Sequence, residues 1–101
     1  MKRHRVASVD ELPSNGGIAV DVGEKRIALF RHQGEIFALD ETCPHRGGPL
    51  HEGVLDRGVV LCPWHQWQFD LKTGCSPVNP LSRVRVYAVR VEGSDVILEM
   101  D

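Results

Sequence analysis

Short runs of β-branched and aromatic residues alternate with turn residues along almost the whole chain, a pattern that is typical of strands. The expected strands cover residues 2–9, 17–22, 26–32, 35–39, 59–62, 67–70, 84–91 and 95–100. Only residues 9–12, Val-Asp-Glu-Leu, indicate a helical turn. The pattern predicts an all-β fold, a small sandwich or barrel.

Turn residues indicate where one expected strand ends and the next begins. Gln33–Gly34 forms a tight turn, and Glu92–Ser94 joins the last two strands as a hairpin. Residues 53–58 read as a short loop excursion before the strand at 59. In the stretch 84–91 the alternation is imperfect, and it is clearest at Val84, Val86, Ala88 and Val91.

Composition narrows the class of protein. The chain has 101 residues, which predicts a single domain over residues 1–101, and a formal net charge of −2 without a basic stripe. Nucleic acid is therefore not expected as a partner. No segment has the apolar length of a membrane span or a signal peptide, so no membrane association is expected. Three cysteines, an odd number, argue against a disulfide framework and favour a cytoplasmic location.

Two short stretches combine a cysteine with a histidine. Cys43 and His45 are one residue apart after the strand at 35–39, and Cys62 and His65 are two residues apart between the strands at 59 and 67. Sixteen residues separate His45 from Cys62. Thiolate and imidazole are the ligands that soft metals select. Two loops that each offer one cysteine and one histidine can converge on one metal centre.

Two kinds of centre fit this set of ligands. Structural zinc sites pair their ligands as C-x₂₋₄-C and H-x₃₋₅-H, and the mixed pairs of this chain match that spacing poorly. The alternative is a [2Fe–2S] cluster in which one iron takes two cysteines and the other takes two histidines. A zinc-stapled interaction module stays open as an alternative at this point.

The pattern C-P-H-x₁₆-C-P-W-H resembles that of Rieske proteins, and the resemblance covers nearly the whole chain. It implies an all-β Rieske-type sandwich or barrel, with a cluster-binding subdomain of two loops at about residues 41–70. It also implies one [2Fe–2S] cluster per chain. Its expected ligands are Cys43, His45, Cys62 and His65.

The sequence departs from the respiratory and photosynthetic kind of Rieske protein. That kind carries an extra cysteine pair, where this chain has Gly48 and Trp64. It also uses a serine and a tyrosine to hydrogen-bond the cluster sulfurs, where this chain has Trp67 and Phe69. Fewer donors to the sulfurs predict a reduction potential near the low end of the Rieske range, on the order of −150 mV.

The resemblance implies a soluble one-electron carrier, a monomer when free, that links a flavin-containing reductase to a terminal oxygenase. The small subunit of an assimilatory NAD(P)H-nitrite reductase is the alternative, with the large subunit as partner. No nucleophile–base pair or mononuclear iron triad is evident, so we expect no catalytic residue on this chain.

Three other features stand outside the predicted centre. Cys75 is expected to be a free thiol, and His51 an exposed loop histidine whose spacing fits no ligand position. All charged residues past Arg90 are acidic, which indicates either a solvated edge or a surface that steers a partner.

Overall fold

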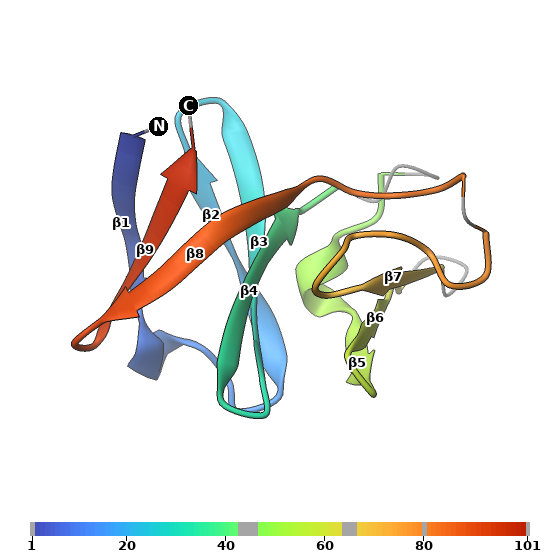
Figure 1. Ribbon diagram of the computed structural model, residues 1–101, viewed down its shortest axis with the longest axis horizontal. Helices are drawn as coiled ribbons and strands as arrows, with labels where there is room; N and C mark the ends of the chain where they lie inside the picture. The colour runs from blue at the N-terminus through green and yellow to red at the C-terminus, as the bar shows by residue number, and fades with distance from the viewer. Residues whose placement is uncertain (1, 43–46, 64–66, 80, 101) are drawn as a thin grey trace.

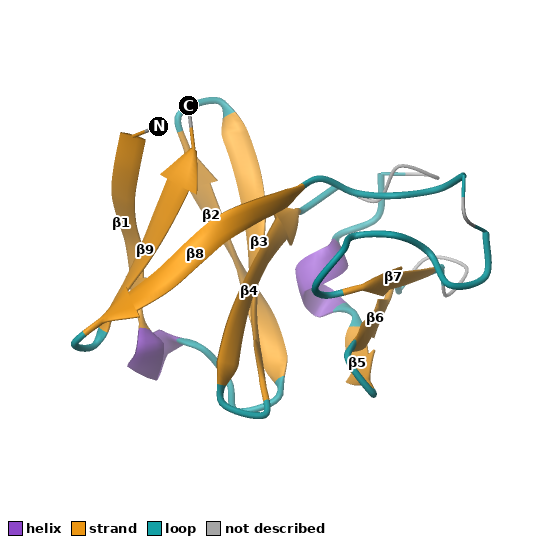
Figure 2. Cartoon of the chain, viewed as in Figure 1, coloured by secondary structure: helices purple, strands orange, loops and turns teal. Residues whose placement is uncertain are grey.

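The computed structural model describes residues 2–42, 47–63, 67–79 and 81–100, and nearly all of its regular structure is β (Figures 1 and 2). The larger sheet has the antiparallel strand order β1 (Lys2–Ser8), β9 (Asp95–Met100), β8 (Val86–Glu92), β4 (Glu35–Asp40), β3 (Lys25–His32), β2 (Gly16–Val22). The smaller sheet contains β5 (Val54–Asp56), β6 (Val59–Leu61) and β7 (Gln68–Asp70). Two single-turn 3₁₀ helices complete the described elements, η1 (Val9–Glu11) and η2 (Leu50–Glu52). The all-β prediction and the helical turn near residue 9 are confirmed.

Two tight turns fix the register of neighbouring strands. Gln33 and Gly34, between β3 and β4, both have positive φ, at 51° and 80°. Arg57 and Gly58, between β5 and β6, repeat this conformation at 53° and 81°. Positive φ at both central residues is the type I′ geometry, whose twist matches that of antiparallel strands.

Strand β3 is buried on both faces. Ile27 and Leu29 point into a core inside the curled larger sheet, together with Ala38, Leu98 and Tyr87. The alternate residues Ala28 and Phe30 point into a second core between the two sheets. That second core also contains Leu39, Leu50, Leu55, Val60, Cys62, Phe69, Leu71 and Val84. Successive side chains of a strand face opposite sides, so a continuous apolar run is what a strand between two cores requires.

The smaller sheet is an insertion into the larger one. Figure 1 shows the chain leaving β4, building β5 to β7, and returning through a long extended segment to β8. At the root of the insertion, where the chain leaves β4 and rejoins β8, these two strands pair directly. There the amide of Asp40 donates to the carbonyl oxygen of Arg85 at 3.0 Å. The edge strands β1 and β2 contact each other, so the larger sheet forms a half-open barrel.

Two details of the strand prediction were wrong. Residues 54–56 form strand β5 rather than a loop, because the short segment pairs with β6 although Val54 is exposed. Strand β8 begins at Val86, and it is Tyr87 and Val89 that face the core, while Val86 and Ala88 are exposed. Val84 breaks the alternation because it belongs to the second core.

In the part of the chain that the structure describes, no helix is long and apolar enough to cross a membrane.

Candidate metal centre

The first ligand loop, Thr42–Pro49, is closed at its base. Thr42 and Pro49 form an antiparallel bridge, and the amide of Leu50 donates to the carbonyl oxygen of Glu41 at 2.9 Å. Gly47 has a φ of +74°, a conformation that a side chain disfavours. Cys43 and His45 lie outside the described residues, so the structure describes only the two ends of the loop that carries them.

The second ligand loop, Cys62–Trp67, is closed in the same way. The amide of Cys62 donates to the carbonyl oxygen of Trp67 at 2.7 Å, continuing the pairing of β6 with β7. Cys62 was expected as the last residue of the strand at 59–62, and it follows β6, which ends at Leu61. Its side chain is buried in the second core. Trp64 and His65 lie outside the described residues.

The described ends of the two loops lie against each other. Leu50, which follows the first loop, shares the second core with Cys62 and Phe69, and Trp67 packs against it. Gly53 makes this approach possible, because a β-carbon at that position would lie 2.2 Å from the carbonyl oxygen of Leu61. A small hollow of about 110 Å³ borders Cys62 on this side.

The described residues fit a metal cluster between the two loops. Each loop is closed by backbone hydrogen bonding, which limits how far its ligands can separate. The sulfur of Cys62, one of the predicted ligands, lies in apolar surroundings and is of the soft kind that such a cluster takes. Within the described ranges no three metal-ligating side chains come together, since three of the four predicted ligands lie outside them.

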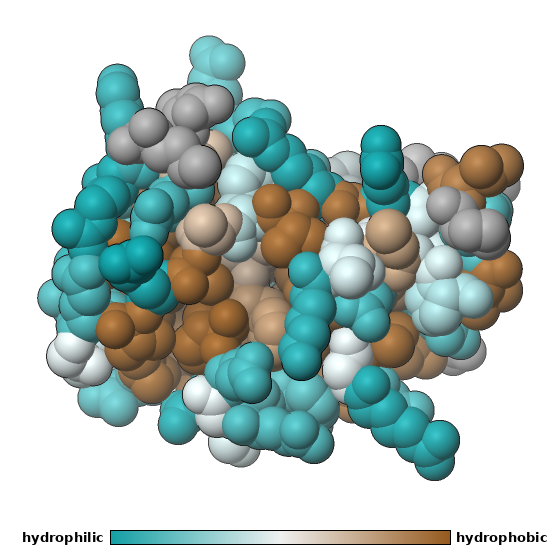
Figure 3. Space-filling model, viewed as in Figure 1, coloured by the Kyte–Doolittle hydropathy of each residue, from teal (hydrophilic) through white to brown (hydrophobic). Residues whose placement is uncertain are grey.

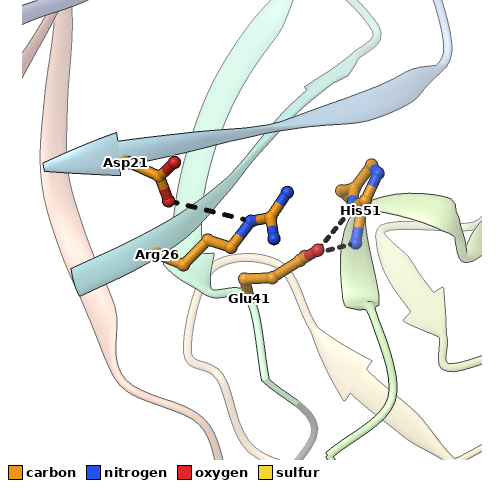
Figure 4. Close-up of polar contacts among 4 residues, drawn as sticks. All are labelled: Asp21, Arg26, Glu41 and His51. Atoms are coloured by element: carbon orange, nitrogen blue, oxygen red, sulfur yellow. Dashed lines mark hydrogen bonds and ion pairs between the residues drawn. The ribbon is translucent and has the colours of Figure 1, made fainter. Parts of the chain in front are cut away.

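Sequence reasoning missed a polar pair at the first loop. Glu41 is buried at the end of β4, and both of its carboxylate oxygens bind His51, one to the backbone amide at 2.8 Å and the other to ring Nδ1 (Figure 4). The prediction of an exposed loop histidine was therefore wrong. The signal was hidden because η2, which turns His51 back toward Glu41, is too short to be recognised in the sequence.

A second polar contact stabilises the root of the insertion. The Tyr87 hydroxyl donates to the Asp40 carboxylate at 2.5 Å, and the Arg85 guanidinium lies 5.0 Å from the centre of the Tyr87 ring. Burial, and then the hydrogen bond to Asp40, raise the pKa of Tyr87 to about 12.

The acidic residues past Arg90 are largely neutralised by partners. Arg3 pairs with Glu92, Arg5 with Asp95 at 2.9 Å, and Arg90 with Glu99 at 3.0 Å. In the described part of the chain, the acidic side chains of the β8–β9 hairpin are therefore paired with arginines and do not form an uncompensated acidic surface. Cys75 is exposed and forms no disulfide.

Comparison with known proteins decides the family. The sequence profile of the Rieske [2Fe-2S] domain matches residues 2–88. The chain belongs to the Rieske [2Fe-2S] domain family. The predicted family, the Rieske fold and the Rieske-type cluster are thereby confirmed, and zinc is set aside.

Individual Rieske proteins match over nearly their full length. The ferredoxin component of the naphthalene 1,2-dioxygenase/salicylate 5-hydroxylase systems of a Ralstonia species is 35% identical over 96 residues, which cover 94% of this chain and 92% of the relative. The ferredoxin of carbazole 1,9a-dioxygenase from Nocardioides aromaticivorans IC177 has a TM-score of 0.91 and 27% identity, with 100% of both chains covered. A structure described as the small subunit of an NADH-dependent nitrite reductase from Mycobacterium tuberculosis has a TM-score of 0.88 and 26% identity, covering 96% of this chain and 93% of that one.

Proposed function

We propose that this Rieske protein is a soluble one-electron carrier that passes electrons from a flavin-containing reductase to a terminal oxygenase. The observation that carries the proposal is the match to ferredoxin components at 35% identity over 92% of the relative's length. The named dioxygenase systems indicate the class of acceptor.

Within this proposal, Cys43, His45, Cys62 and His65 hold the cluster. The bound group supplies reversible one-electron reduction, and two neutral histidine ligands favour a higher potential than four thiolates would. The chain itself orients the ligands through the closed bases of both loops. Phe69 and Trp67 pack around the base of the second loop, against the buried Cys62.

The remaining assignments belong to the same proposal. Residues 1–101 form one domain, with residues 41–70 as its cluster-binding part, and the free protein is a monomer in the cytoplasm. Direct pairing of β4 with β8 across the insertion supports a single unit. The odd number of cysteines and the exposed thiol of Cys75 support a reducing compartment.

The small subunit of a nitrite reductase remains a second candidate. It is favoured by the likeness to the mycobacterial structure at 26% identity. A carrier would dock transiently with its partners, whereas a subunit would stay in a permanent complex. The ferredoxin is the better supported of the two, because its relatives are more similar in sequence.

Size-exclusion chromatography of a native lysate reduced with dithionite distinguishes the two candidates. The Rieske electron-spin signal is followed across the fractions. We expect it to elute near the 11.3 kDa of the free chain, as a mobile carrier would. Elution with a larger complex that carries flavin and haem would instead support the nitrite reductase subunit.

The ligand assignment is tested with two cysteine variants. Cys62→Ser is expected to abolish the Rieske spin signal of purified, iron-replete protein, because the buried thiolate is lost as a ligand. Cys75→Ser is the matched control and should retain the full signal, since Cys75 is exposed. Retention of the signal in Cys62→Ser would refute the assignment.

A further inference from the structure

The base of the first ligand loop is held by a buried carboxylate. Glu41 follows β4, and its side chain is only 6% exposed. One carboxylate oxygen accepts the backbone N–H of His51 at 2.8 Å, and the other binds the ring Nδ1 of the same residue (Figure 4). The backbone of Glu41 adds two bonds, donating to Arg26 at 3.1 Å and accepting from Leu50 at 2.9 Å.

The carboxylate is directed to one partner. Arg26 lies nearby in Figure 4, but its guanidinium pairs with Asp21, at 3.8 Å. Among the described residues, both side-chain bonds of Glu41 therefore go to His51, whose side chain is 25% exposed. A carboxylate is costly to bury unless it is paired and hydrogen-bonded, so this pairing is what keeps Glu41 inside.

These contacts span the segment that carries half of the proposed ligands. Eight residues, 42–49, separate Glu41 from Leu50, and they include Cys43 and His45. A loop that is closed before its ligands bind has less conformational entropy to lose on binding. Ligands held by a locked supporting layer also keep their geometry better than ligands on a loose loop.

We propose that Glu41 and His51 form a clamp that positions the first ligand loop for cluster binding and slows loss of the cluster. Both are positioning residues, since they act through the loop and not on the cluster. The proposal rests on the ligand assignment made above. It goes beyond that assignment by naming residues outside the Cys/His pattern that determine how firmly the cluster is held.

The test measures the half-life of the cluster in reconstituted protein incubated with EDTA, followed by its visible circular dichroism. In His51→Leu the ring donor is lost, and we expect a half-life about tenfold shorter than in the wild type, the effect of one charge-assisted hydrogen bond. His51→Asn keeps an N–H donor near the position of Nδ1. It should restore most of the half-life. Glu41→Gln keeps one oxygen acceptor but loses the charge, and an intermediate loss of about threefold is expected.

His32 provides a matched control. Its ring Nδ1 bonds the Asn15 side chain at 2.6 Å, on an exposed part of the larger sheet. His32→Leu removes the same kind of contact and should leave the half-life unchanged. Hydrogen exchange of the cluster-loaded protein, measured by mass spectrometry, should increase in the peptide around residues 41–51 for His51→Leu but not for His32→Leu.

Several results would overturn the clamp. Wild-type half-lives in both His51→Leu and Glu41→Gln would do so, and so would an equal loss in His32→Leu. A half-life in His51→Asn that is no longer than in His51→Leu would also refute it. That result would show that residue 51 only fills space and that its hydrogen-bond donor has no effect on the cluster. If His51→Leu does not fold, the half-life of Glu41→Gln decides alone. Absence of a Rieske signal in the wild type would be a failure of the proposed function and not of the clamp.

Discussion

Among single residues, the polar side chains at the root of the insertion show how the inserted sheet is attached to the larger one. Tyr87 is buried in the core of the larger sheet, yet its hydroxyl reaches Asp40 at the point where β4 ends. Glu41, the next residue, reaches His51 on the other side. The chain therefore leaves the barrel between two partly buried hydrogen bonds. Both satisfy polar groups that would otherwise be costly to bury.

Removing the Tyr87 hydroxyl tests the first of these bonds. Tyr87→Phe should lower the free energy of unfolding by about 1 kcal/mol. For a chain of this size that corresponds to about 4–8 °C in the apparent melting temperature of the cluster-loaded protein. The control is Phe37→Tyr, which adds a hydroxyl at a partly buried ring of the neighbouring strand instead of removing one. An unchanged melting temperature in Tyr87→Phe would contradict the role of the bond.

The same bond predicts a pH dependence. The pKa of Tyr87 is about 12 in the folded protein and about 10 in an unfolded chain, so folding favours the protonated phenol. Its contribution to stability is complete below about pH 10 and is lost as the pH rises from about 10 to about 12. Melting curves at increasing pH should show this decline in the wild type and a smaller one in Tyr87→Phe.

At the scale of elements, the segment that returns from β7 to β8 is ordered without being a strand. The Ser76 hydroxyl accepts the amides of Val78 at 3.3 Å and Asn79 at 3.1 Å, and the Asn79 side chain accepts the amide of Leu81 at 3.2 Å. These bonds turn two large apolar side chains outward, Val78 at 72% and Leu81 at 93% exposure. Figure 3 shows hydrophobic surface left of the centre and at the right end of this view, with hydrophilic side chains between the two.

Ser76→Ala tests whether the hydroxyl orders this segment. Loss of the acceptor should destabilise the turn by about 1 kcal/mol and raise hydrogen exchange at Val78 and Asn79 several-fold. Ser82→Ala serves as the control, because Ser82 takes part through its backbone. Equal exchange in Ser76→Ala and the wild type would show that the backbone alone holds the turn.

At the scale of the whole molecule, the ligand loops sit on an inserted sheet whose aromatic residues lack hydroxyl groups. Phe69 is fully buried and Trp67 is half-buried at the base of the second loop. Neither can supply the O–H donor that the respiratory kind of Rieske protein offers to the sulfurs. We therefore expect the reduced cluster to be less stabilised than in the respiratory kind.

A low reduction potential follows. We expect a midpoint on the order of −150 mV, the low end of the Rieske range. Protein-film voltammetry of the cluster-loaded chain measures it directly. A midpoint above zero would mean that other donors, or a more polar setting, compensate for the missing hydroxyl groups.

The sequence alone predicted the all-β class, the position of most strands along the chain, and the family. Apolar alternation and the spacing of Cys43, His45, Cys62 and His65 can be read along the chain without knowledge of the fold. It also placed Cys62 where a strand meets the second loop, one residue away from the observed end of β6. Only the tertiary structure decided the rest. Strand β5 exists because β6 pairs with it, Val84 is buried because the second core receives it, and His51 is held by Glu41 across the first loop. Each of these contacts joins residues that are distant in the sequence, or lies on a segment too short to show a hydrophobic period. The sequence pattern therefore carries no signal for them, and they are seen only in the folded chain.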